Sequence, residues 1–142
     1  MCGIIGFIGG EQAAPILLGG LKKLEYRGYD SAGIAILEDG KIEIAKSKGR
    51  LEILSDKIEG GRSFFGTVGI GHTRWATHGE PSDANSHPHR SSSGKFAIVH
   101  NGIIENYAAL KAQLQAQGCI FASETDTEAV SYTHLRAHET TL

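Results

Sequence analysis

Short apolar runs and helical spacings alternate along the first half of the chain. Apolar runs over Gly3–Ile8, Gly33–Leu37 and Val68–Thr73 each predict a buried strand. Between the first two, Ala13–Leu24 repeats apolar residues three and four positions apart, which predicts a helix, with Pro15 tolerated in its first turn. This half therefore predicts a sheet with helices packed against it.

A hairpin is predicted after the second of these strands. Glu38-Asp39-Gly40 is typical of a tight turn, and Lys41–Ala45 then returns with alternating Ile42 and Ile44. The next apolar pattern, over Leu51–Ile58, predicts a second helix.

The second half is more polar, and its predicted elements are shorter. Residues 81–95 are polar and rich in turn formers, so they predict a loop. The elements expected around it are a strand over Phe96–Val99, a helix over Asn106–Gln117, a short strand over Cys119–Phe121, and a helix from Thr125 capped by Thr125 or Ser123. Many strands with few βαβ units predict an α+β fold with mostly antiparallel sheet.

Composition and charge narrow the class of protein. A chain of 142 residues with 40% hydrophobic and 21% charged residues suits one globular domain. The formal net charge of −2 gives no basic surface for a nucleic acid or a membrane, and no run approaches the roughly 20 apolar residues of a membrane span. The two cysteines, Cys2 and Cys119, form no CxxC motif, which favours a reducing, cytoplasmic location.

Polar clusters next to apolar strands are the candidates for chemistry, because sites are commonly built from loops on a rigid scaffold. They are Cys2, YRGYDSAG at 26–33, HTRWATHGE at 72–80, HNGIIEN at 100–106 and SETDTE at 123–128.

Cys2 has two readings. It becomes the first residue if Met1 is removed, and its α-amine can then take the thiol proton and later return it to a leaving amine. The other reading is an inert, buried thiol at the start of a strand. Residue chemistry alone leaves both open.

Other polar residues suit substrate capture and charge stabilisation. Arg74 has a planar fork that matches a carboxylate, and Asp126 can hold an ammonium group, although each also fits an ordinary salt bridge. Asn101-Gly102 supplies an amide and a backbone N–H for an oxyanion, or it is a common turn dipeptide. Trp75 is either a core residue or the wall of a pocket.

A metal site is the rival hypothesis for the seven histidines. His87-Pro88-His89 is the closest pair, but no HExxH motif or cysteine cluster accompanies it. We therefore expect no metal and no cofactor, and interpret most histidines as hydrogen-bonding loop residues.

Taken in order, the five clusters resemble one family. The Cys2 start, YRGYDSAG, HTRWATHGEPS, HNGIIENY and SETDTE are similar to the glutaminase domain of the glutamine–fructose-6-phosphate aminotransferase family. That domain is a class II glutamine amidotransferase, one of the N-terminal nucleophile hydrolases. The resemblance runs from residue 2 to about residue 130. Amidophosphoribosyltransferases share the Cys start and an RG-x-DS element, and they are the alternative within this class.

The resemblance implies a four-layer αββα sandwich and a role for each matching residue. Cys2 is the nucleophile, and Asn101 and Gly102 form the oxyanion hole. The other implied roles are Arg74, Thr77 and His78 binding the glutamine α-carboxylate, Asp126 binding its ammonium, Trp75 in the loop that closes over it, and Arg27 ordering the nucleophile's surroundings.

The resemblance also implies that the chain is incomplete. Residues 1–130 match about the first half of the domain, and the synthase domains that use fructose 6-phosphate, in a parent expected to be a homo-oligomer, are missing. The ending SYTHLRAHETTL departs from the family and resembles translated sequencing-adapter sequence, so residues 131–142 are expected to be non-native. We expect weak or no glutaminase activity from the fragment, and a non-catalytic glutamine-binding module is a further alternative.

Overall fold

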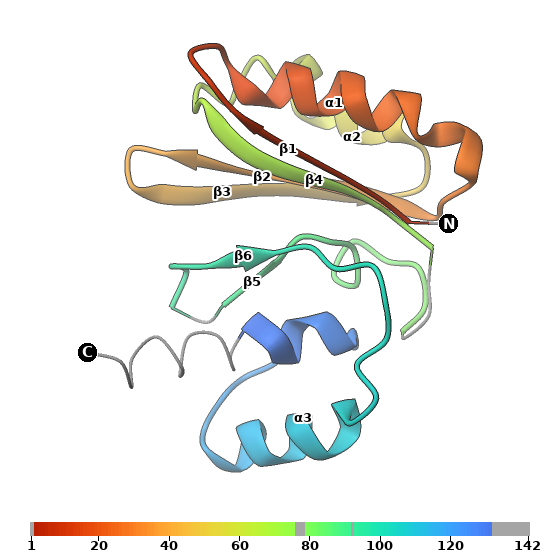
Figure 1. Cartoon of the computed structure of the whole chain (residues 1–142), viewed down its shortest axis with the longest axis vertical. Coiled ribbons are helices and arrows are strands. Elements are labelled where there is room, and N and C mark those ends of the chain that lie inside the picture. Colours follow the sequence, from red (N-terminus) through yellow and green to blue (C-terminus); the bar gives the residue numbers. More distant parts are fainter. Residues whose placement is uncertain (1, 76–78, 92, 132–142) are drawn as a thin grey trace.

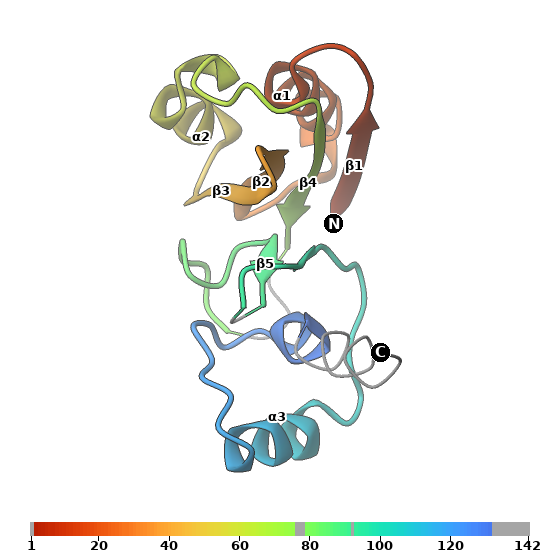
Figure 2. The ribbon, with the colours of Figure 1, turned by 90° about the vertical axis from the view of Figure 1, so that its left-hand side faces the viewer.

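The computed structural model describes residues 2–75, 79–91 and 93–131. Helices α1 (Ala13–Lys23) and α2 (Leu51–Lys57) cover one face of the larger sheet, and the small β5–β6 sheet lies on its other side (Figure 1). Below that lie α3 (Tyr107–Ala116) and helical residues 126–131 (Figure 2). The order helix, sheet, sheet, helix confirms the predicted α+β class and its layers.

The strands described here pair antiparallel throughout. The larger sheet has the order β1-β4-β2-β3, and the smaller pairs β5 with β6. Their bounds are Gly3–Ile8 (β1), Ser31–Glu38 (β2), Lys41–Lys48 (β3), Val68–Arg74 (β4), His89–Arg90 (β5) and Ala97–Ile98 (β6). Asp39 and Gly40 join β2 to β3 with φ values of 51° and 74°, the left-handed pair that a tight hairpin turn requires.

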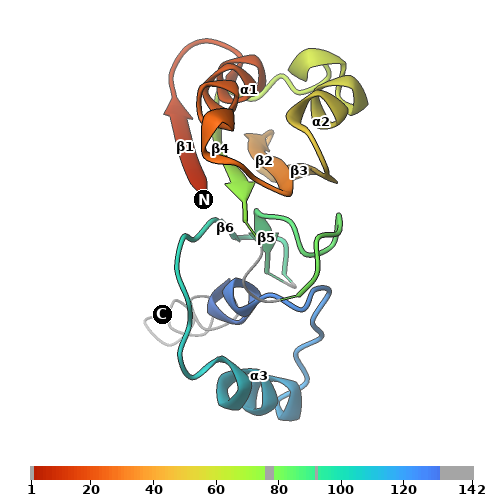
Figure 3. The same cartoon turned by 90° about the vertical axis from the view of Figure 1, so that its right-hand side faces the viewer.

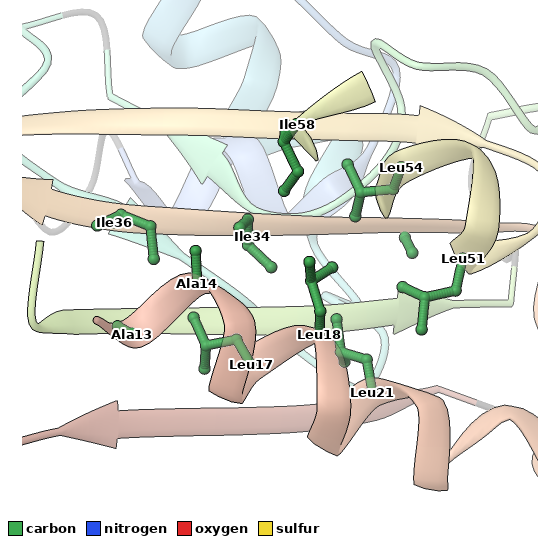
Figure 4. Close-up of a cluster of buried hydrophobic side chains, with 11 residues drawn as sticks. Ala13, Ala14, Leu17, Leu18, Leu21, Ile34, Ile36, Leu51, Leu54 and Ile58 are labelled. Carbon is green, nitrogen blue, oxygen red and sulfur yellow. The ribbon is translucent and has the colours of Figure 1, made fainter. Parts of the chain in front are cut away.

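The core of the upper layers lies between the two helices and the sheet (Figure 4). It consists of small and branched aliphatic side chains that share one buried face of each element. They are Ala13, Ala14, Leu17, Leu18, Leu21, Ala32, Ile34, Ile36, Leu51, Leu54 and Ile58. Burial of this apolar surface is the main stabilising contribution in this half of the molecule.

Alternation along β4 separates the core from the polar layers. A side chain at Gly71 would touch Leu21 of α1, so odd-numbered positions face the helices. Even-numbered His72 and Arg74 therefore face the opposite side, where both are buried. The same strand thus packs the core and carries polar groups to the second sheet.

Close approach of the two sheets depends on Gly33 of β2. A Cβ at this position would collide with the His87 carbonyl and come within 2.8 Å of the Lys46 Cβ. The segment before β5 therefore lies directly on the larger sheet. Lys46 Nζ binds that segment by donating to the carbonyls of Ala84, Ser86 and Pro88 at 3.2, 2.9 and 3.2 Å.

The structure corrects two predictions in the second half. Cys119–Phe121 is not a strand: Cys119 N–H donates to the Leu114 carbonyl at 3.0 Å, so this segment closes the end of α3. The predicted loop over residues 81–95 contains strand β5, which pairs His89 with Ile98. Residues 132–142 of the expected non-native tail lie outside the described residues. No helix in the described ranges has the length and apolarity to cross a membrane.

Candidate functional site

The candidate site lies at the junction of the upper sheet and the lower layers, where β1 starts and β4 ends (Figures 1 and 3). Strands β1 and β4 pair Gly3 with Thr73, and Gly3 N–H also donates to Thr73 Oγ1 at 3.1 Å. Trp75 N–H donates to Cys2 Sγ at 3.1 Å, and Sγ lies 3.6 Å from the Trp75 carbonyl. These contacts hold the Cys2 thiol at the start of β1, an edge strand of the larger sheet.

A pocket of about 240 Å³ opens beside this thiol. Its lining comes from five separate parts of the chain. The lining residues are Cys2, Arg74, Trp75, His87, His100, Gly102, Ile103, Thr125, Asp126 and Thr127. Sites for drug-sized ligands usually measure about 300–1,000 Å³, so this volume suits a smaller molecule.

Arg74 and Asp126 place opposite charges in the same pocket. Arg74 donates to the Gly79 carbonyl at 3.0 Å and to the Glu80 carbonyl at 3.4 Å, contacts that hold its guanidinium in place. Asp126 Oδ2 accepts the Ile104 N–H at 2.7 Å. Both side chains are buried, so each ionic group is oriented before any ligand arrives.

The position of Asp126 is set by a hydrogen-bonded turn before helical residues 126–131. The Glu128 carboxylate accepts the N–H groups of Ala122 and Ser123 at 2.7 and 2.8 Å, as well as the Ser123 hydroxyl. Thr125 Oγ1 lies 2.9 Å from Ser123 Oγ and 2.6 Å from His89 Nε2. This network links the turn to β5 and fixes the chain on both sides of Asp126.

Asn101 and Gly102 lie in the connection between β6 and α3. Gly102 lines the pocket, whereas Asn101 is not among the lining residues. Instead, Asn101 Oδ1 lies 2.7 Å from His72 Nε2, which also lies 3.2 Å from the His100 carbonyl. The structure thus places Gly102 in the pocket lining and gives Asn101 the buried His72 as its neighbour.

The remaining predicted site residues divide into three groups. Trp75 is 56% exposed and lines the pocket, so the core-packing alternative for this residue is wrong. The backbone of Arg27 lies in the short helix η1 (Glu25–Arg27). Thr77 and His78 lie outside the described residues.

Three buried histidine rings contact one another, and one of them, His87, lines the pocket. The His72 and His87 rings stack at 4.1 Å, and the His89 ring meets that of His87 edge-on at 4.6 Å; we call these three the histidine stack. Burial lowers the pKa of His72 to about 4 and that of His89 to about 2, and it lowers the pKa of His87 further. The nearby positive charge of Arg74 adds to each effect.

The histidine arrangement does not resemble a metal centre. Among the described side chains, no group of three or more His, Cys, Asp or Glu residues is placed to hold a metal ion. The three rings contact one another through their faces and edges, and a shared ion needs their nitrogens to converge.

A larger cavity, of about 610 Å³, lies elsewhere and shares no lining residue with the Cys2 pocket. Its charged groups already have protein partners. Lys46 binds three carbonyls, Arg90 donates to the Ile42 carbonyl, Lys57 pairs with Asp83, and Glu128 holds the turn described above. The Cys2 pocket, which contains a thiol and two charged side chains, is therefore the candidate site despite its smaller volume.

Sequence reasoning missed several lining residues. Thr125, Thr127 and Ile103 belong to motifs that the sequence singled out, but their contributions depend on how the lower layers fold over the sheet. His87 and His100 were interpreted as loop residues, although both line the pocket. His100 belongs to the HNGIIEN cluster, whereas His87 lies in the polar loop over residues 81–95, where no motif indicated a contact with the pocket.

Comparison with known proteins gives consistent matches. The glutamine amidotransferase domain family matches residues 59–141. Two curated relatives are named glutamine–fructose-6-phosphate aminotransferase (isomerizing). The one from Caldanaerobacter subterraneus subsp. tengcongensis is 65% identical over 92% of this chain and 21% of that protein. The one from Clostridium tetani is 60% identical over 93% of this chain and 22% of that protein.

Solved structures also match most of this chain. Glutamine phosphoribosylpyrophosphate amidotransferase from B. subtilis, in complex with ADP and GMP, aligns with a TM-score of 0.75 and 32% identity over 92% of this chain and 28% of that chain. A structure described as the allosteric regulatory enzyme of purine biosynthesis aligns with a TM-score of 0.76 and 34% identity, with the same coverage. The chain spans about a fifth of the length of the curated relatives named above.

Proposed function

Because this chain belongs to the glutamine amidotransferase domain family, we propose that it hydrolyses the side-chain amide of L-glutamine, with Cys2 as nucleophile. One observation carries the proposal. Cys2 and Arg74 come from the larger sheet and Gly102 and Asp126 from the layers below it, yet the four residues line one small pocket. Together they supply a nucleophile, two oppositely charged groups and a backbone donor.

The two charges suit the two ends of an α-amino acid. Arg74 binds the α-carboxylate, since its planar guanidinium matches a carboxylate in geometry and charge. Asp126 binds the α-ammonium. A glutamine held in this way extends its amide toward Cys2, while Trp75 closes the exposed side of the pocket.

The reaction then follows acyl-transfer chemistry. The Cys2 thiolate attacks the amide carbon, and the negative charge on the former carbonyl oxygen is stabilised by the Asn101 amide and the Gly102 N–H. The tetrahedral intermediate collapses, the C–N bond breaks and ammonia leaves with an added proton. Water hydrolyses the resulting thioester to glutamate and restores the thiol.

The proton carrier in this proposal is the α-amine of Cys2. Removal of Met1 exposes that amine on the same residue as the thiol, where it accepts the thiol proton and returns it to the leaving ammonia. Arg27 orders the surroundings of the nucleophile, and Thr77 and His78 assist carboxylate binding. The proposal extends to the whole protein as a cytoplasmic homo-oligomer in which the ammonia aminates fructose 6-phosphate. It is supported by curated relatives that are named for amino transfer between glutamine and fructose 6-phosphate.

The deciding experiment mixes the purified chain with radiolabelled glutamine and quenches with acid, which preserves a thioester. The chain is expected to form labelled protein and to release small amounts of glutamate and ammonia, in line with the weak activity expected of a fragment, and Cys2→Ala is expected to do neither. Cys119→Ala, which changes the other free thiol, is the matched control and is expected to react normally. Turnover that survives Cys2→Ala contradicts the nucleophile assignment.

The labelling experiment, combined with calorimetry, tests the alternative that the chain binds glutamine without catalysis. That alternative predicts saturable glutamine binding in the calorimeter, with no labelled protein and no ammonia. Mass spectrometry of the intact protein reports whether Met1 is absent.

The variant Arg74→Gln tests the role of Arg74 in substrate capture. It is expected to bind glutamine more weakly, while the reactivity of Cys2 toward iodoacetamide stays unchanged. Glutamine binding equal to that of wild type contradicts this role.

A further inference from the structure

His72 is a buried polar residue that the proposed reaction leaves without a role. Its ring is fully buried on β4, and it lies on the face that also carries Arg74 to the pocket. One ring atom, Nε2, reaches two oxygens: Asn101 Oδ1 at 2.7 Å and the His100 carbonyl at 3.2 Å. The contacts link the centre of the larger sheet to the connection that carries the proposed oxyanion hole.

The chemistry of these partners fixes which ring nitrogen carries the proton. A backbone carbonyl can only accept a hydrogen bond, so Nε2 facing the His100 carbonyl must be a donor. Nδ1, on the other side of the ring, is buried and has no hydrogen-bond partner among the described residues. A charged ring would leave an N–H donor unsatisfied at that position. The arrangement therefore selects the neutral Nε2–H tautomer.

This tautomer also determines the orientation of the Asn101 amide. Because Nε2 donates, the Asn101 atom at 2.7 Å must be the acceptor Oδ1, and the NH2 group is left for another partner. An amide in the opposite orientation would present its oxygen to a developing negative charge. An oxyanion hole works only when donors face that charge.

We propose that His72 is a positioning residue that holds the Asn101 side chain with its NH2 end available to the oxyanion. This inference rests on the proposed function, since it assigns a role within the same site. His72 touches no substrate atom: it acts through Asn101 and the His100 carbonyl. Arg74 and His100 are the ionisable groups whose charge acts on this ring, and both favour its neutral form, while the His87 ring stacks on it at 4.1 Å.

The first test measures the tautomer without any need for catalysis. Nitrogen-15 NMR of the labelled chain distinguishes protonated from bare ring nitrogens. The expected result at pH 7 is a His72 ring with a proton on Nε2 and a bare Nδ1. A proton on Nδ1 alone, or a doubly protonated ring, overturns the proposal.

The second test measures coupling between the two residues. Single-turnover glutamine cleavage is compared for wild type, His72→Phe, Asn101→Ala and the double variant. His72→Phe is expected to slow cleavage with little change in KM, approaching the roughly 10²–10³-fold cost of losing one oxyanion donor. The double variant is expected to be no slower than Asn101→Ala alone, whereas multiplied losses contradict action through Asn101.

Two further measurements separate this proposal from folding and from the proposed function. His72→Gln keeps an N–H donor and is expected to recover part of the cleavage rate lost in His72→Phe. Alkylation of Cys2 by iodoacetamide forms no oxyanion, so its rate is expected to stay the same in every variant. If wild type cleaves no glutamine, the proposed function fails, while the tautomer measurement still decides the arrangement of His72.

Discussion

The two halves of this molecule are stabilised by different physical interactions. Above the pocket, α1, α2 and the larger sheet share one continuous cluster of buried aliphatic side chains. Below it, the described buried cluster consists of Leu114 and Ala129. Apart from Pro88, the other buried residues described there are polar: Asn85, Ser86, His87, His89, Ser91, Ser123, Thr125, Asp126, Thr127, Glu128 and Ser131.

This difference shows how one small domain combines a rigid platform with a reactive surface. The apolar half is held by burial, which is nondirectional and tolerates small shifts. The polar half is held by hydrogen bonds, which need defined geometry and leave costly unpaired groups when broken. The candidate site lies where the two halves meet, with Cys2 and Arg74 from the platform and Asp126 and Gly102 from the polar half.

Mild acid is expected to have the largest effect, because the histidine stack between the halves stays uncharged only in the folded protein. An unfolded histidine titrates near ~6.5, whereas burial lowers the pKa of His72 to about 4 and that of His89 to about 2. Below pH ~6.5 the unfolded chain therefore binds protons that the folded chain does not bind. The contribution of the neutral histidines to the free energy of unfolding is complete above that pH and falls toward pH ~4, by about 1.4 kcal/mol per pH unit for each histidine.

Urea unfolding followed by circular dichroism at several pH values measures this slope. His89→Asn removes one titrating ring, so its slope is expected to be shallower than that of wild type. An unfolding midpoint that does not change between pH 7 and pH 5 contradicts the assignment of neutral, buried rings.

Truncation of the apolar platform is expected to have the next largest effect. Leu17 is fully buried between α1 and the sheet, so Leu17→Ala leaves a cavity and is expected to cost about 2–5 kcal/mol of unfolding free energy. Ile8, 82% exposed at the end of β1, is the matched control, and Ile8→Ala is expected to change stability by less than about 0.5 kcal/mol. Equal losses for both variants in chemical denaturation are incompatible with the core described above.

Breaking the polar half is expected to have a smaller and more local effect. Glu128→Gln replaces an acceptor of the Ala122 and Ser123 N–H groups by an amide, which offers one oxygen in place of two. The expected cost is about 1.5–3 kcal/mol, typical of hydrogen bonds to a charged group. Hydrogen exchange is expected to speed up in residues 120–131 while β2 and β4 keep their protection. Uniform loss of protection would show that the halves unfold as one unit.

The smallest effect is expected at the exposed contact between the halves. Asp83 accepts the Lys48 N–H at 2.6 Å, which lowers the pKa of its carboxyl, and pairs with Lys57 at 3.4 Å. Because both partners are more than half exposed, Asp83→Asn is expected to cost less than about 1 kcal/mol. Salt titration of wild type and variant measures the ion pair, and a difference that does not shrink at high salt would locate the effect in the hydrogen bond.

The sequence predicted the strands and helices of the apolar half more completely than those of the polar half. The strands Gly3–Ile8 and Val68–Arg74 and the helix Ala13–Lys23 were recognisable because their apolar periodicity is the property that buries them. The strand His89–Arg90 was missed, since it is two residues long and its sequence is polar. Cys119–Phe121 has the composition of a strand, but no strand of the described chain lies beside it to pair with.

The residues of the candidate site were predictable from the sequence, but the hydrogen bonds between them were not. Cys2, Arg74, Gly102 and Asp126 belong to motifs whose order resembles a known family, and the structure brings them to one pocket. No motif indicates that His72 contacts Asn101, because that contact depends on the packing of one layer onto another. Long-range contacts between polar groups leave no periodic signal in a sequence.

Gly33 sets different rules of substitution for the two faces of one strand. On the helix side of β2, Ile34 and Ile36 belong to the aliphatic core, where an exchange for another hydrophobic residue of similar volume is tolerated. On the opposite side, even one methyl group at Gly33 would collide with the His87 carbonyl. Mutational scanning should therefore record broad tolerance at positions 34 and 36 and near-complete intolerance at position 33, although all three belong to the same short apolar run.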